Sequence, residues 1–318
     1  TRVENIQTLG PYKVERREIG QNIYLGRNLL YFGKIPKIEK AIGMVIEDEK
    51  TAIRLFQTNK IDIVRLIGKR GYQGLVSEEV IKRSEKNVVI IAGMNTQDDQ
   101  LKNRHLRRAI AMAIDRSLFL KMYGESVAAA NRYAPAFVTQ DDTALALPFD
   151  LEKAKDELKL SGFDPSKPIA FDVTDVGESL TIVENIQSQL KTHLGLNIEI
   201  NKVDLNLASS RIAEKKAAFF LRGLGSNEMS AQSFLNDYYR FDNQAHWDSP
   251  KYRRLLDQSF SLRGRAKKKK VAEAEAFLLG EAPVIPLFHD AVTMLVSPRV
   301  RNFTTSPLSV GRIAEMSL

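Results

Sequence analysis

Residues 217–239, AAFFLRGLGSNEMSAQSFLNDYY, join an apolar run to a helix-like segment through Gly223 and Gly225. A buried strand followed by a glycine-containing turn and the start of a helix is typical of an α/β layer. The same order of elements can also hold an anion at the start of the helix. The stretch therefore predicts an α/β fold, and it raises the question whether the turn binds phosphate.

The two glycines do not complete a phosphate-binding motif. Position 228 is Glu where the dinucleotide fingerprint G-x-G-x-x-G has its third glycine, and the Gly-Lys-Ser/Thr of a P-loop is absent. We interpret Gly223 and Gly225 as residues of a tight strand-to-helix turn, a position that favours glycine.

Strands and helices alternate on both sides of this stretch. C-terminal to residue 100, apolar runs and helical spacing predict strands at 169–176, 196–204 and 217–225, and helices at 103–123, 150–163, 178–195, 206–216, 249–260 and 263–277. Within 103–123, Asp115 could cap a second helix, and Gly162 is expected to end the helix at 150–163. We interpret the last apolar run, 282–296, as a pair of strands.

The first 100 residues predict a second α/β layer. Alternating residues around Gly20 indicate a hairpin, and residues 41–46, 61–67 and 87–95 resemble buried strands. Residues 48–60 predict a helix with Asp48 as its N-cap. The cap pattern that begins at Ser77 predicts another helix at 76–84.

Composition places the chain among folded globular proteins, with 318 residues and 43% hydrophobic residues. No run of about 18 apolar residues predicts a membrane span, and the absence of cysteine excludes disulfides and thiolate metal sites. The net charge of +8 is concentrated partly in RGRAKKKKVAEAEAF, residues 263–277. We interpret this run as the solvated face of a helix with i, i+4 charge pairs; a nucleic-acid or membrane patch is the alternative, although no aromatic residues are interleaved for base stacking.

No pattern in the sequence indicates catalysis. The four histidines lie far apart without metal-ligand spacing, and no nucleophile motif is accompanied by its partners. We therefore expect neither an enzyme nor a metal or cofactor.

Six segments, in order, resemble the extracytoplasmic solute-binding proteins of peptide ABC importers. They are LGPYKVERREIGQNIYLGRNLLYFGKIPKIEK (9–40), TAIRLFQTNKIDIV (51–64), MNTQDDQLKNRHLRRAIAMAIDRSLF (94–119), DLEKAKDELKLSGF (150–163), SPKYRRLLDQS (249–259) and EAPVIPLFH (281–289). No single motif decides the resemblance, but their order along nearly the whole chain is hard to obtain by chance.

The resemblance implies a two-lobed fold like that of the periplasmic binding proteins, of the class II or cluster C type. Residues 1–93 would form part of lobe I, 94–291 the complete lobe II, and 292–318 a return to lobe I. The chain would be incomplete at its N-terminus, with further lobe I strands before Thr1. Near Asn95 and His289 the chain would cross between the lobes as hinge strands.

The resemblance also places the opening stretch in the ligand cleft. GLGSNEMSAQSFL is similar to the family segment G-W-x-x-D-Y-x-x-P-x-x-F-L, whose Asp commonly pairs with the peptide α-amine. Here Leu224 stands at the Trp position, Asn227 at the Asp position and Glu228 at the Tyr position. Either Glu228 supplies the missing charge or the ligand has no free amine there, and Arg222 could meet an anionic group. The expected ligand-binding residues are therefore Asn95, Arg222, Leu224, Gly225, Asn227, Glu228 and Phe234.

The function implied is capture of a peptide or other small solute for the membrane permease of an ABC importer. We expect a monomer, no nucleic acid as partner, and a periplasmic or surface-anchored location. The alternative from another class is the ligand-sensing domain of a transcription regulator, because this fold is also fused to DNA-binding domains.

Overall fold

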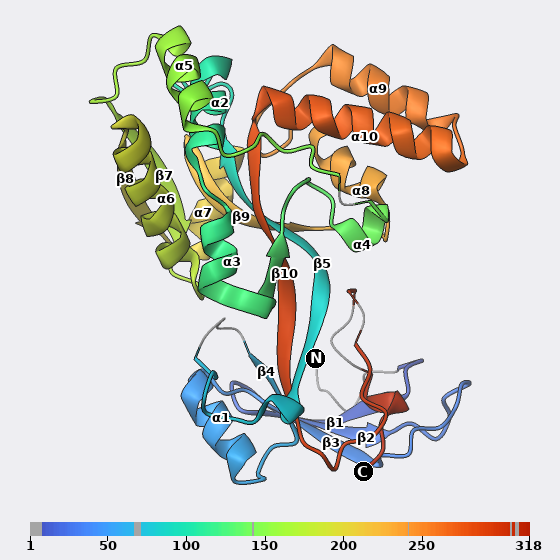
Figure 1. Cartoon of the computed structure of the whole chain (residues 1–318). Coiled ribbons are helices and arrows are strands. Elements are labelled where there is room, and N and C mark those ends of the chain that lie inside the picture. The colour runs from blue at the N-terminus through green and yellow to red at the C-terminus, as the bar shows by residue number, and fades with distance from the viewer. Residues whose placement is uncertain (1–7, 67–70, 142, 241, 306, 309–311) are drawn as a thin grey trace. The chain divides into compact units, whose positions relative to one another are not determined.

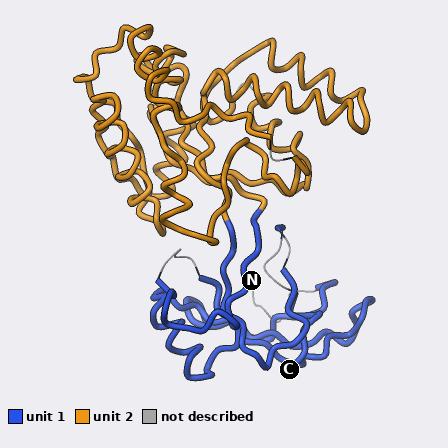
Figure 2. The backbone as a smooth tube through the Cα atoms, in the orientation of Figure 1, with its two compact units in different colours: residues 1–86, 291–318 blue, residues 87–290 orange. Residues whose placement is uncertain are grey.

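The computed structural model describes residues 8–66, 71–141, 143–240, 242–305, 307–308 and 312–318. The chain divides into two compact units (Figure 2). Unit 1 comprises Thr1–Lys86 and Ala291–Leu318, and unit 2 comprises Asn87–Asp290. Two long strands, β5 (Ile81–Met94) and β10 (Val284–Val296), have residues in both units.

Unit 2 is built on a mixed sheet with the strand order β10-β5-β9-β7-β8, and β6 pairs with β10 (Figure 1). β9 runs antiparallel to β5 and parallel to β7, and β7 runs parallel to β8. The remaining bounds are β6 (Val127–Ala129), β7 (Pro168–Thr174), β8 (Asn197–Val203) and β9 (Phe219–Gly225).

Helices cover both faces of this sheet. Successive strand residues point to opposite sides, so each strand supplies apolar side chains to both faces. Ala92 and Met94 pack into one hydrophobic cluster, and Val89 and Ile91 pack into the other. The first cluster includes α2 (Arg104–Ala113), α3 (Ser117–Tyr123), α5 (Leu151–Ser161) and α6 (Ser179–Leu194). The second includes α7 (Leu205–Ala213), α8 (Ala231–Leu235), α9 (Pro250–Phe260) and α10 (Gly264–Glu281), with α4 (Ala136–Thr139) packed beside it.

Aromatic side chains supply much of the first cluster. The rings of Phe171 and Phe219 stack at 4.0 Å between centroids, and both side chains are fully buried. Burial of each phenyl ring contributes about 1.5–3 kcal/mol to folding, so this contact ties β7 firmly to β9.

Unit 1 contains a three-stranded antiparallel sheet with the order β1-β2-β3. Its elements are β1 (Tyr12–Glu18), β2 (Asn22–Arg27), β3 (Lys40–Met44), α1 (Glu49–Gln57) and β4 (Ile63–Leu66). α1 buries Ala52, Ile53 and Phe56 in a cluster with β4, Tyr72 and Leu295. Among the described residues, three-residue 3₁₀ turns lie at Glu78–Val80, Gly124–Ser126, Asn236–Tyr238 and Ile313–Glu315.

The locally encoded predictions are confirmed. Gly20 has φ +73 in the β1–β2 hairpin, and the Asp48 carboxylate accepts the Thr51 amide at the start of α1. Gly162 ends α5 in the left-handed conformation. Asp115 accepts the Ser117 amide beside α3, although Arg116 is the N-cap residue.

The predictions for three segments that were expected to form helices or buried strands are wrong. Residues 76–84 form a short 3₁₀ turn and the start of β5 rather than a helix, because Ile81 is buried in the unit 1 cluster. Residues 284–296 form one strand rather than two. β3 is largely exposed, not buried, because it is an edge strand that pairs only with β2 in the described sheet. The prediction for 61–67 extends to Ile67, which lies outside the described residues.

Candidate functional site

Residues 217–239 contain β9, which pairs with β5, and continue into the loop beyond one end of this ladder. Gly225 pairs with Val88, and Phe219 pairs with Met94. Gly223 and Gly225 lie within the strand and neither has a positive φ, so the predicted strand-to-helix turn at these residues is wrong. A Cβ atom on Gly225 would lie 2.9 Å from the Asn87 carbonyl oxygen. Glycine is needed here for a close backbone approach.

Asn87 holds the loop between β9 and α8. Its Nδ2 donates to the carbonyl oxygens of Ser226 and Glu228 at 2.6 and 3.0 Å. The Ser226 hydroxyl contacts the Ser233 hydroxyl at 2.6 Å and accepts the Glu228 amide at 3.0 Å. These bonds fix the backbone while the side chains of Asn227 and Glu228 stay exposed. The loop therefore presents two polar side chains from an ordered support.

Sequence reasoning missed Asn87. It is 2% exposed, and it precedes the apolar run of β5 without any pattern that marks it. Only the long-range pairing of β5 with β9 brings its amide to the loop. Asn87 is the last residue of the polar run 82–87, so no local signal sets it apart.

Leu224 lines a small pocket of about 230 Å³ together with Asp237, Tyr238, Arg240, Asp242, Asn243 and Gln244. Asp237 keeps a solvent-exposed surface, yet partial burial against the protein raises the pKa of its carboxyl to about 6. No hydrogen bond or ion pair of the Asp237 carboxylate is found among the described residues. Asp237 is thus an acid near Leu224 that sequence reasoning did not select.

The other predicted site residues are scattered. Arg222 is half-buried on β9, two residues from Leu224 and therefore on the same face of the strand. Phe234 is fully buried and packs edge-on against Tyr133, which gives it a place in the core.

Asn95 lies at the opposite end of the β5–β9 ladder from Gly225. Its Nδ2 donates to the Lys215 carbonyl oxygen at 3.1 Å, and its Oδ1 accepts the Gln97 amide. The structure gathers Leu224, Gly225, Asn227 and Glu228 but does not bring Asn95 to them. Contact of any predicted residue with a ligand stays a prediction.

Metal-binding chemistry has no visible support in the described part of the chain. Its His, Asp and Glu side chains form no group of three that could hold a metal ion. Within the same residues, no helix is both long and apolar enough to span a membrane.

Residues 1–246 match the sequence model of the bacterial extracellular solute-binding proteins, family 5 Middle. The chain belongs to this family. The match covers more than half of the chain, and it confirms the resemblance drawn from the six motifs.

Three proteins similar to this family 5 chain share less than a quarter of its residues. It is 23% identical to the dipeptide-binding protein DppE of Bacillus subtilis, over 94% of this chain and 58% of the relative. A periplasmic oligopeptide-binding protein, OppAIV, of Borrelia burgdorferi has the same fold, with a TM-score of 0.85 and 18% identity over 99% of this chain and 65% of that one. The periplasmic binding protein DppA of Helicobacter pylori, solved with peptide STSA, gives 0.82 and 19% over 97% and 62%.

The chain thus spans less than two thirds of the length of these relatives. The predicted fold class, that of the periplasmic binding proteins, is confirmed by the shared fold. Each relative named above is a binding protein, so the transcription-regulator alternative gains no support.

Proposed function

We propose that this family 5 chain captures a peptide, or a solute with peptide-like polar groups, for the permease of an ABC importer. The family match is the observation that carries the proposal. Relatives named as dipeptide- and oligopeptide-binding proteins support the solute class. The protein would work outside the cytoplasmic membrane as a non-catalytic component.

We infer that the loop at residues 225–228 contacts the solute. Its backbone is held by Asn87, and its side chains at 227 and 228 are exposed. An ordered loop that presents polar groups loses little conformational freedom on binding, which favours affinity. The Asn227 amide provides neutral donors and an acceptor, whereas Glu228 provides a carboxylate.

Capture by hinge closure is the mechanism proposed for the two units. The unit of residues 87–290 would be the lobe predicted at 94–291, and unit 1 would belong to lobe I. β5 and β10 have residues in both units, so their backbone would carry the bending.

Calorimetric titration of the full-length protein with a pool of tripeptides tests the proposal. We expect saturable heat, and hydrogen exchange should show slower exchange of the amides of residues 223–230 in the complex. Heat without protection at 223–230 would reject the loop as a contact. Absence of heat with tripeptides and with longer pools would reject peptide as the solute.

A further inference from the structure

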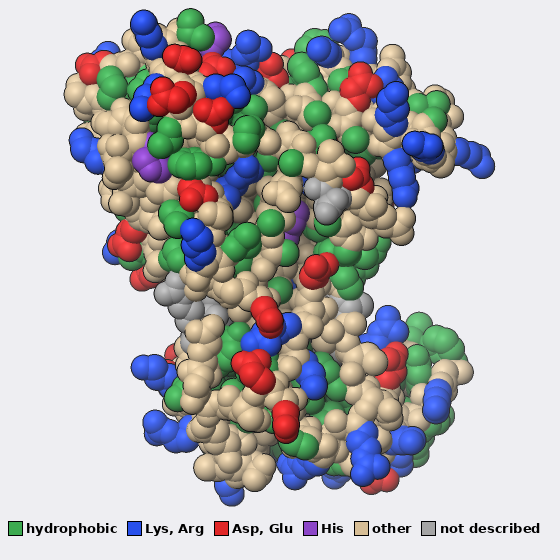
Figure 3. Space-filling view, in the orientation of Figure 1, with side chains coloured by type: hydrophobic (Ala, Val, Ile, Leu, Met, Phe, Trp, Pro, Cys, Tyr) green, Lys and Arg blue, Asp and Glu red, His purple; other side chains and the backbone are tan. Residues whose placement is uncertain are grey.

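A pocket of about 630 Å³ lies within unit 2 beside the first turns of α10, and we call it the α10 pocket. Figure 3 shows Lys and Arg side chains gathered over this end of α10. Five cationic side chains and one carboxylate line the pocket: Arg132, Arg265, Lys267, Lys268 and Lys269, with Asp141. Its apolar wall includes Val138, Met229 and Val271.

The start of α10 has an unusual charge pattern. Its N-cap residue, Arg263, makes no side-chain capping bond, and the first turn contains no acidic residue. Backbone N–H groups at a helix start need acceptors, and the helix dipole disfavours cations there. The local sequence thus places positive charge where a helix alone would favour negative charge, a conflict expected at functional sites.

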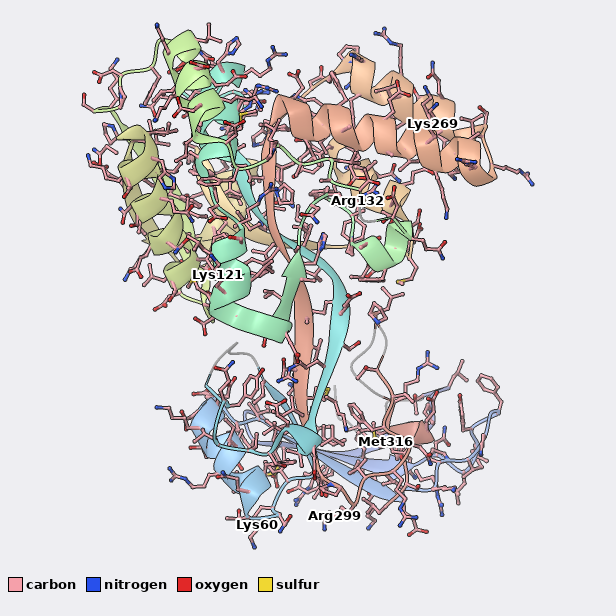
Figure 4. All side chains as sticks on the ribbon, viewed as in Figure 1. Lys60, Lys121, Arg132, Lys269, Arg299 and Met316 are labelled. Atoms are coloured by element: carbon pink, nitrogen blue, oxygen red, sulfur yellow. The ribbon has the colours of Figure 1, made fainter. Side chains whose placement is uncertain are left out.

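Three of the cations are free to meet a ligand. Lys268 donates to Gln140 Oε1 at 3.0 Å. For Arg265, Lys267 and Lys269, no ion pair or side-chain hydrogen bond is found with any described residue. Figure 4 shows Lys269 on α10 and Arg132 on the segment that leads to α4. Arg265 and Lys269 are exposed, as a solvated face requires, but neither they nor Lys267 form the predicted i, i+4 charge pairs within the described chain.

Gln232 supplies an independent sign of a missing partner. It lines the same pocket and is 7% exposed, and its side-chain Nε2 is buried without a hydrogen-bond partner in the described structure. A buried amide donor without an acceptor is unfavourable. Because Gln232 lines the pocket, rotation of its side chain would expose this amide to a ligand oxygen that could accept its hydrogen bond.

The acid in the pocket is already neutralised. The Asp141 carboxylate lies 3.0 Å from an Arg132 guanidinium nitrogen and accepts the Thr143 hydroxyl and amide. The other side of Arg132 pairs with Glu275 at 2.6 Å. Arg132 therefore forms a fixed wall, and the uncompensated charge belongs to α10.

We propose that the α10 pocket binds a phosphate-type anion. A tetrahedral oxyanion can accept at once from helix N–H groups, from the amide of Gln232 and from the Lys and Arg side chains of α10. The apolar wall suits a phosphate ester, either a free one or the headgroup of an anionic lipid. The pocket lining includes Met229, directly after the loop at residues 225–228. The proposed anion does not depend on the nature of the transported solute.

Two probes and two charge-matched variants of the full-length protein test the proposal. The probes are inorganic phosphate, titrated with NMR detection of the α10 amides, and vesicles of equal parts phosphatidylglycerol and phosphatidylcholine. Lys267→Glu/Lys269→Glu alters the pocket. Lys60→Glu/Lys191→Glu makes the same charge change at exposed lysines that do not line the pocket. Gln232→Leu removes the buried amide without changing charge.

We expect the pocket variant to weaken phosphate binding roughly tenfold or more, Gln232→Leu to weaken it less, and the control to bind like the wild type. The same ranking with vesicles alone would identify the lipid headgroup as the source of the anion. No binding of either probe, or equal weakening by both double variants, would overturn the proposal. Circular dichroism confirms that each variant is folded.

Discussion

At the residue scale, the carboxylate of Glu275 is a strong local constraint in unit 2. It is fully buried, pairs with Arg132, and accepts the amides of Tyr133 and Ala134 at 2.7 and 3.0 Å. These bonds join α10 to the segment before α4. A buried pair of this kind is costly to break because the remaining charge stays desolvated.

Glu275→Gln should lower the free energy of unfolding by about 3–5 kcal/mol, the range for loss of one partner of a buried pair. Denaturant unfolding with circular dichroism measures it. Glu273→Gln is the matched control two residues away, where the ion pair with Lys270 is half-exposed and contributes about 0–1 kcal/mol. Equal losses for the two variants would contradict the assigned role of Glu275.

Asp237 predicts a pH dependence of stability. Its folded-state pKa of about 6 lies above the value of about 3.9 for an unfolded Asp. The folded protein therefore binds more protons between these two pKa values, and stability falls as pH rises through that window. Asp237→Asn should raise the thermal midpoint at pH 7 but not at pH 4. The gain in the free energy of unfolding at pH 7 should be less than about 1 kcal/mol, because the side chain keeps solvent contact.

Asp242→Asn provides the opposite sign as a control. The Arg240 hydrogen bond lowers the pKa of Asp242, so its ionised form is favoured in the folded protein and the variant should not gain stability at pH 7. Thermal melts at pH 4 and pH 7 compare the two variants. A pH 7 gain for Asp242→Asn equal to that for Asp237→Asn would refute the explanation.

Asn227→Asp should strengthen binding of peptides with a free α-amine by roughly tenfold, because a carboxylate forms a stronger charge-assisted bond with an ammonium than an amide does. N-acetylated versions of the same peptides should gain nothing. Calorimetry on both sets measures the difference, and unchanged affinity for the free-amine peptides would reject the assignment of residue 227.

At the scale of elements, the β5–β9 ladder decides where the candidate loop lies. Val88 faces Gly225, and the chain has no room for a side chain at Gly225 beside the Asn87 carbonyl. Both features depend on residues more than a hundred positions apart, and neither is visible in the sequence of either strand.

Gly225→Ala should destabilise the protein by about 1–3 kcal/mol, the range for overpacking, and weaken solute binding by displacing the loop. Gly280→Ala in α10 is the control, since an added Cβ there meets nothing within 4 Å and should be neutral or stabilising by up to about 1 kcal/mol. Chemical denaturation measures both. An equally small effect at Gly225 would mean that the close approach relaxes without cost.

Sequence reasoning succeeded where the signal is local. The Asp48 cap, the Gly20 hairpin and the Gly162 helix end depend on neighbouring residues only. It failed where distant partners decide, as at Ile81, whose burial extends β5 backwards over a predicted helix. The candidate loop was located from motif order, but Asn87 and Asp237 became visible only through tertiary contacts.

At the scale of the whole molecule, the family match and the shared fold make solute capture the central claim. The two units, with β5 and β10 belonging to both, support closure on a solute as the proposed mechanism. If closure occurs, small-angle scattering of the full-length protein should show a smaller radius of gyration when the solute is added. An unchanged radius with saturating solute would contradict hinge closure while leaving binding intact.

Native mass spectrometry of the full-length protein, purified from its own cells, tests the central claim most directly. The account predicts a set of bound masses that match short peptides and that are released on denaturation. Protein that carries only a solute without peptide-like polar groups, or that stays unliganded and takes up no peptide from a mixed pool, would contradict it.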